Sequence, residues 1–148
     1  MTKGLLMVAL ALGLASQATG PPKAAFDAEL ARKLGADERG MKMYALVLLK
    51  TGLRQDLSKA ESDRAFEGHM ANINRLAERG DLVFAGPLEK NDRYRGIFIF
   101  NVKTREDAEA LVATDPAVIA GALAGDVYLL YGSAALQEVN AIHRRISK

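Results

Sequence analysis

The chain has 148 residues, a formal net charge of +2 and no cysteine. This length is that of one domain, and the 49% hydrophobic and 26% charged residues are typical of a globular protein rather than of a disordered polar chain. The lack of cysteine excludes disulfides and thiolate chemistry, the two histidines argue against a multi-histidine metal site, and the small net charge gives no electrostatic reason to expect nucleic acid.

The first residues have the pattern of a secretory signal peptide. Lys3 precedes an apolar run of about 11 residues, followed by Ser16, Gln17 and Ala18. A transmembrane span needs about 20 apolar residues, so this run is too short to be one. A buried core helix is the alternative interpretation. We therefore expect residues 1–18 to be cleaved near Ala18, and the mature protein to be periplasmic or secreted without a membrane anchor.

Residues 19–40 are expected to form an N-terminal extension with one short helix, because two prolines open it and residues 26–34 have weak helical spacing. The compact domain then covers residues 41–148. Its first strand is predicted at residues 43–50, which are almost continuously apolar.

A long helix is predicted next. Ser58 and Glu61 form a capping box at its start, and Gly80 is a natural C-terminal cap. Its apolar stripe is expected to contain Phe66, His69, Met70, Ile73, Leu76 and Ala77. Strands at residues 82–85 and 96–102 follow, the first stopped by Gly86-Pro87 and both joined through a polar turn.

The second half of the domain is predicted to contain two more helices and one more strand. Thr104 caps a second helix, which ends at Asp115-Pro116, and a loop or short helix leads to a strand at residues 127–131. Ser133 starts a terminal helix that is expected to turn four apolar residues inward: Leu136, Val139, Ile142 and Ile146.

This order predicts an α+β fold: a ferredoxin-like βαββαβ domain with a four-stranded antiparallel sheet, two helices on one face and an extra C-terminal helix. Residues 46–49 and 97–100 are apolar on both sides of their strands, although two helices cover only one face. We therefore predict a homodimer with the sheets packed face to face. A monomer whose N-terminal segment covers the sheet is the alternative.

His69 and Asp115 are the candidate catalytic residues. His69 lies on the inward stripe of the first long helix, where it is either a core histidine or a general acid or base. Asp115 is either the N-cap of a helix that begins at Pro116 or a carboxylate that orients an imidazole.

Three further residues are candidates for a substrate pocket. Gly86 and Pro87 either end a strand or shape a pocket wall. Tyr94 is either a pocket residue or, like its neighbour Arg95, an exposed hairpin residue. No nucleotide-binding, zinc-protease or serine-hydrolase motif is present, so no cofactor or metal is expected. The basic C-terminus lacks interleaved aromatic residues, and nucleic acid is not an expected partner.

The chain resembles the YciI-like, or YCII-related domain, family. The resemblance rests on Gly68-His69 in the helix, on Ala85-Gly86-Pro87 and on Asp115-Pro116 with Gly121, and it covers residues 43–131. It implies a dimeric α+β barrel and an active site built around a His–Asp pair, here His69 and Asp115. Ala117 stands where many members have phenylalanine, which implies a wider pocket.

The function that these features favour is a small, cofactor-independent lyase or isomerase in which His69 and Asp115 move a proton on a cyclic or phenolic molecule. Dehydrochlorination of hydroxylated chloroaromatics by some members of the family is a lyase-type precedent. The alternatives are a non-catalytic protein that binds a small ligand and a structural dimer of the same fold, in which the pair only holds a loop to a helix.

Overall fold

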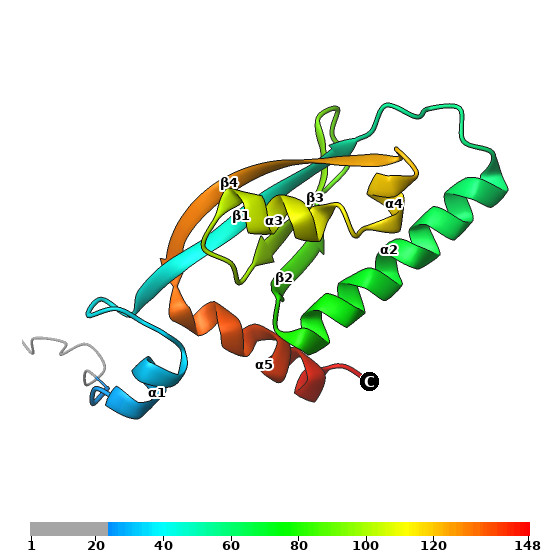
Figure 1. Ribbon diagram of the computed structural model, residues 1–148. Coiled ribbons are helices and arrows are strands. Elements are labelled where there is room, and N and C mark those ends of the chain that lie inside the picture. Colours follow the sequence, from blue (N-terminus) through cyan, green and yellow to red (C-terminus); the bar gives the residue numbers. More distant parts are fainter. Residues whose placement is uncertain (1–23) are drawn as a thin grey trace, which may run out of the picture.

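The computed structural model describes residues 24–148, and the predicted signal peptide lies outside them. Its centre is a four-stranded antiparallel sheet with the strand order β2-β3-β1-β4 (Figure 1). The strands are β1 (Met41–Thr51), β2 (Leu82–Pro87), β3 (Tyr94–Phe100) and β4 (Leu123–Ser133). The predicted α+β, ferredoxin-like fold is confirmed.

Three strands are longer than the sequence predicts. β1 and β4 pair along their entire lengths, from Met41 with Ser133 to Thr51 with Leu123. The glycines and Asp126 of β4 interrupt its apolar pattern, which is why only residues 127–131 are recognisable as a strand from the sequence. β2 continues through Gly86 and Pro87 instead of ending before them, because an edge strand tolerates a proline.

The helices that follow Ser58 and Thr104 begin at their predicted caps, but the second of them ends before Asp115. The segment after Ser133 begins as a 3₁₀ helix and becomes α-helical only at Val139. They are α1 (Ala28–Lys33), α2 (Lys59–Arg79), α3 (Arg105–Val112), α4 (Pro116–Ile119), the 3₁₀ helix η1 (Ala134–Glu138) and α5 (Val139–Ile146). Ser58 and Glu61 form the predicted capping box of α2, which ends at Gly80 with a φ of 78°. Thr104 caps α3, and α1 lies within the predicted N-terminal extension.

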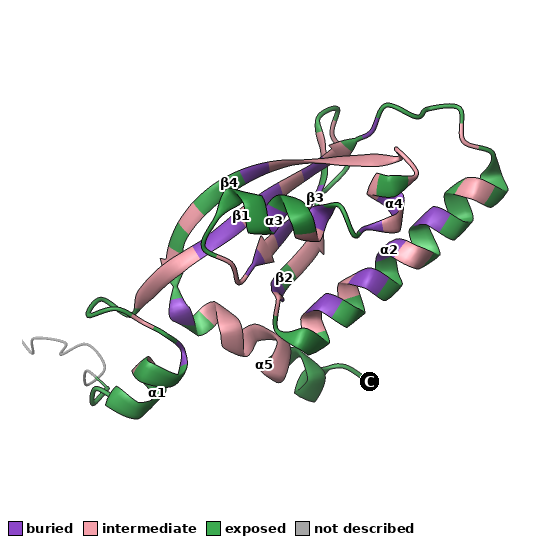
Figure 2. Ribbon diagram, viewed as in Figure 1, coloured by how far each residue is buried: buried purple, intermediate pink, exposed green. Residues whose placement is uncertain are grey.

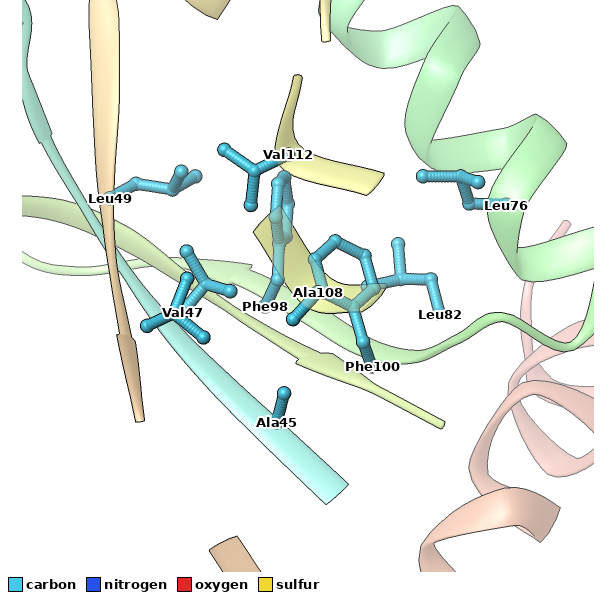
Figure 3. Close-up of a cluster of buried hydrophobic side chains, with 10 residues drawn as sticks. Ala45, Val47, Leu49, Leu76, Leu82, Phe98, Phe100, Ala108 and Val112 are labelled. Atoms are coloured by element: carbon cyan, nitrogen blue, oxygen red, sulfur yellow. The ribbon is translucent and has the colours of Figure 1, made fainter. Parts of the chain in front are cut away.

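The hydrophobic core lies between the sheet and the helices α2 and α3 (Figure 3). Alternate residues of β1 point into it and are almost fully buried: Ala45, Val47 and Leu49. They meet two phenylalanines of β3, Leu76 of α2 and two small side chains of α3. Both helices therefore cover the same face of the sheet, and one end of this layer holds the candidate site.

The opposite face of the sheet is apolar and only partly covered. Leu46 pairs with Ile99 on one side and with Tyr128 on the other, and Leu48 pairs with Ile97. The four aliphatic side chains are half-buried, and Tyr128 is 47% exposed. We call this surface, formed by Leu46, Leu48, Ile97, Ile99 and Tyr128, the open face.

Two predictions about inward side chains are wrong. Phe66 is 65% exposed and Met70 is also exposed, because α2 packs through Ala65, His69, Asn72 and Leu76, a stripe rotated away from Phe66. Ile142 and Ile146 of α5 are exposed as well, and α5 has no buried residue (Figure 2). The side chain of Asn140 fastens the start of α5 to the carbonyl of Leu82, and the later turns extend past the sheet.

Within residues 24–148, no helix has the length and apolar character that crossing a membrane requires.

Candidate active site

His69 and Asp115 meet inside the protein. Nδ1 of His69 lies 2.6 Å from Oδ2 of Asp115, and their side chains are 11% and 1% exposed. A carboxylate can only accept a hydrogen bond, so Nδ1 donates to Asp115 and the lone pair of the neutral imidazole lies on Nε2. Within residues 24–148, Nε2 makes no hydrogen bond.

Asp115 does both things that the sequence left open. It is the N-cap of α4, where its Oδ1 accepts a hydrogen bond from the backbone N–H of Ala117 at 2.9 Å, and Pro116 occupies the first turn. Its second oxygen remains for His69. One buried carboxylate therefore fixes both the start of α4 and the orientation of the imidazole. The hydrogen bond from Ala117 holds the carboxylate in position for His69.

The pair forms because α2 and α4 pack closely. A Cβ built on Gly68 would lie 2.7 Å from Cβ of Pro116, so only glycine permits this approach. One turn further along α2, Nη2 of Arg75 donates to Oδ1 of the buried Asn72 at 2.6 Å and to Oγ1 of Thr114 at 3.2 Å. These two contacts hold the residues that flank the pair.

Two aromatic rings stack near the imidazole of His69. The ring of Phe98 lies 5.7 Å from that of His69 and the ring of Phe66 lies 6.2 Å away, both roughly parallel to the imidazole. Phe98 belongs to the core, whereas Phe66 is exposed. Because Asp115 holds one edge of the imidazole and Phe98 of the core stacks near it, the orientation of the imidazole is set before any ligand binds.

His69 lines a cavity of about 610 Å³ between α2 and the sheet, a volume within the usual range for small-molecule sites. Most of its walls are apolar, and three of the lining residues carry polar side chains: Ser62, His69 and Arg95. No aspartate or glutamate is among the lining residues, because Asp115 lies behind His69.

The predicted pocket residues have different positions. Gly86 and Pro87 line the cavity, as does Ala117, whereas Tyr94 does not. Instead, the ring of Tyr94 packs beneath the guanidinium of Arg93, 5.0 Å from ring centroid to Cζ. The neighbouring Arg95, which the sequence indicates only as a hairpin residue, lines the cavity in its place.

Glycines give part of the cavity a backbone wall. A Cβ at Gly96 would lie 2.8 Å from the carbonyl oxygen of Gly86, so β2 and β3 approach here as only glycine allows. Both glycines line the cavity, which places main-chain atoms beside any ligand. The sequence places Gly96 at the start of a predicted strand, but its contact with Gly86 depends on the pairing of β2 with β3.

In the described part of the chain, no group of three or more histidine, aspartate or glutamate side chains is arranged to hold a metal ion. The site therefore consists of one oriented imidazole, one buried carboxylate and a largely apolar cavity with an arginine among its lining residues.

Together these features define a class: an α+β protein with a ferredoxin-like sheet and a His–Asp pair beside an apolar cavity. Within that class, the sequence profile of the YCII-related domain matches residues 43–128, more than half of the chain, and the protein belongs to this family, as its motifs predict.

No curated protein matches the sequence. Among solved structures, the chain is similar to 5-chloro-2-hydroxyhydroquinone dehydrochlorinase (TftG) from Burkholderia phenoliruptrix AC1100, determined in complex with 2,5-dihydroxybenzoquinone. The two are 20% identical, with a TM-score of 0.41, and the match covers 56% of this chain and 90% of that one.

Proposed function

We propose that this protein is a cofactor-independent enzyme that moves a proton to or from a small molecule bound in the cavity, in an elimination or an isomerisation. The observation that carries the proposal is the 2.6 Å contact between Nδ1 of His69 and the buried Asp115, made by a histidine that also lines the cavity. A histidine with only a structural role would not need to border a cavity of this size.

The chemistry follows from the tautomer. With Nδ1–H donated to Asp115, the lone pair of Nε2 can accept a proton from a substrate C–H or O–H group, and the carboxylate stabilises the imidazolium that forms. In an isomerisation the imidazolium returns the proton to another atom of the substrate. In an elimination the electrons of the broken C–H bond form a double bond, and the leaving group departs with its own electron pair.

The cavity favours a cyclic or phenolic substrate. Flat rings and aliphatic side chains line it, among them Phe66, Phe98 and Ile73. A flat, mostly apolar molecule makes good contact with such walls, whereas a sugar or a peptide would leave its polar groups without partners.

Deuterium exchange tests the proposal over a panel of compounds that share this chemistry. Hydroxylated and chlorinated phenols, quinones and cyclic enones are incubated with the protein in heavy water, and NMR follows deuterium incorporation while an electrode follows chloride release. Replacing His69 with Gln should slow any such reaction by about 10²–10⁴-fold. Glu67→Gln, an exposed change two residues away on α2, should leave the rate unchanged.

Equal rates for the wild type and His69→Gln would contradict the proposal. Saturable binding without exchange or product for any compound would favour the second candidate, a non-catalytic protein that binds a small ligand. The largely apolar cavity supports that candidate as well.

We also propose that the working form is a homodimer joined through the open face. Five large apolar side chains lie there side by side, and such a surface is ordinarily buried in a partner. Sedimentation equilibrium should give a mass twice that of one chain, and Ile99→Asp should reduce it to one. A monomeric wild type at all concentrations would contradict the dimer.

Export is a proposal that rests on the sequence alone. Expression of the full chain in a bacterial host, followed by cell fractionation and N-terminal sequencing, should recover a periplasmic or secreted protein cleaved near Ala18. An uncleaved protein in the cytoplasm would contradict it.

A further inference from the structure

Arg95 reaches the cavity because of an irregularity in the sheet. Leu49 of β1 pairs with Gly96 and Lys50 pairs with Tyr94, so Arg95 is the extra residue of a β-bulge in β3. A bulge changes the direction of the side chain that it contains. Regular pairing would put Arg95 opposite Lys50, whereas here Arg95 lines the same cavity as His69.

The guanidinium of Arg95 is held by neutral oxygens. Nε donates to Oγ1 of Thr51 at 2.8 Å, and Nη1 donates to the carbonyl of Asn91 at 3.1 Å. No carboxylate of residues 24–148 forms an ion pair with Arg95, although Lys50 on the neighbouring strand pairs with Asp126. The side chain is therefore positioned, while its charge stays uncompensated.

The rest of the cavity leaves this charge unopposed. The lining residues include no acidic side chain, and the carboxylate of Asp115 already accepts hydrogen bonds from His69 and Ala117. Arg95 is exposed to solvent, so a negative group that enters the cavity meets a positive charge that water also reaches, with largely apolar walls beside it. A charge-assisted hydrogen bond to such a group is stronger than one between neutral partners.

We propose that Arg95 determines specificity by binding the anionic oxygen, carboxylate or phenolate, of an otherwise apolar aromatic substrate. This inference rests on the proposed function and adds the charge of the substrate to it. Nη2 makes no hydrogen bond to residues 24–148, so its N–H groups remain for such an anion. Once the anion is anchored at Arg95, the ring lies against the apolar walls beside His69.

A pair of probes that differ only in charge tests the proposal. Binding of 2-naphthoate and of the neutral 2-naphthamide is measured by NMR titration of the protein, with the amides of Gly86 and Gly96 as reporters. The wild type should bind the naphthoate at least about tenfold more tightly, as expected for a charge-assisted bond. Arg95→Gln should bring this ratio close to one, and Arg95→Lys should leave part of it.

The ratio separates recognition from a structural role. If Arg95 only fastens the β2–β3 turn to Thr51, its loss weakens both probes equally and the ratio stays. Arg93→Gln is the matched control, because it removes an arginine of the same turn that does not line the cavity. An equal affinity for both probes, no binding of either, or an unchanged ratio in Arg95→Gln would overturn the inference.

A protonated His69 would also attract an anion, so the titrations are repeated in His69→Gln. Preference for the naphthoate should persist there, and its loss would assign the anion to His69 and overturn the role of Arg95. The same variant keeps the two proposals apart, since failure of the proton-transfer reaction leaves the charge preference standing. A missing charge preference likewise leaves the deuterium-exchange result unaffected.

Discussion

Gly68 of α2 lies directly against Pro116 of α4, with no room for a side chain: a Cβ on Gly68 would be 2.7 Å from Cβ of Pro116. Each of these residues is adjacent in the chain to one member of the candidate pair. The contact between two residues without any chemistry of their own is therefore what brings His69 within hydrogen-bond distance of Asp115.

Replacing Gly68 with Ala should destabilise the protein. In an ordinary helix interior this change stabilises by roughly 0.5–1 kcal/mol, but here the methyl group must push α4 away, and overpacking of this kind costs about 1–3 kcal/mol. Urea unfolding measures the change, with Glu67→Ala at the neighbouring exposed position as the control. A variant as stable as the wild type would mean that α4 moves freely.

Replacing Asp115 with Asn should reverse the tautomer of His69. The amide oxygen of Asn can still cap α4 in place of Oδ1, but its NH₂ group then faces Nδ1 where Oδ2 was. Nδ1 must accept, the proton moves to Nε2, and the base that faces the cavity is lost. Long-range ¹H–¹⁵N NMR of the imidazole identifies the protonated nitrogen. Protonation of Nδ1 in both proteins would disprove this role of Asp115.

The parts of the fold that can be predicted from the sequence are local ones. Ser58 with Glu61, Gly80 and the Asp115-Pro116 pair act on their own backbone neighbours, so their meaning does not depend on the rest of the chain. The placement of His69 on the inward side of α2 follows from helical spacing in the same way.

What the sequence could not predict depends on contacts between distant segments. The bulge that turns Arg95 into the cavity exists only once β1 and β3 are paired, and no residue type at that position indicates a bulge. The exposure of Phe66 and Ile142 also depends on contacts between distant segments. An apolar stripe indicates that a helix has a packing side, but it does not indicate how much of that side the neighbouring elements cover.

Acid should remove a contribution of the α2 cap. Hydrogen bonds from the Ser58 hydroxyl and then from its backbone N–H hold the pKa of Glu61 below its ordinary value of 4.5. A lowered folded-state pKa contributes stability that is present above 4.5 and is lost as the pH falls through the folded pKa. The wild type should therefore exceed Glu61→Gln in stability at neutral pH, and this advantage should fade in acid. Urea unfolding across this range measures it, and a gap that does not change with pH would contradict the prediction.

Tyr44 should fasten the C-terminal segment to β1. Its side chain is fully buried, and its hydroxyl donates to the carbonyls of Ser133 and Ala134, where β4 turns into η1. Tyr44→Phe leaves these carbonyls without this donor and should cost about 0.5–1.5 kcal/mol of unfolding free energy.

The same contact should fail in alkali. Burial raises the pKa of Tyr44 above 10.0, so the folded state keeps the hydroxyl proton that the unfolded chain loses. Stability from such a raised pKa is fully present below 10.0 and is lost as the pH rises through the folded pKa. The advantage of the wild type over Tyr44→Phe should therefore shrink as the pH passes above 10.0 in urea unfolding followed by circular dichroism. Tyr128→Phe, on the open face, serves as the control, and an advantage that grows with pH would show that the hydroxyl of Tyr44 is not the group that holds the segment.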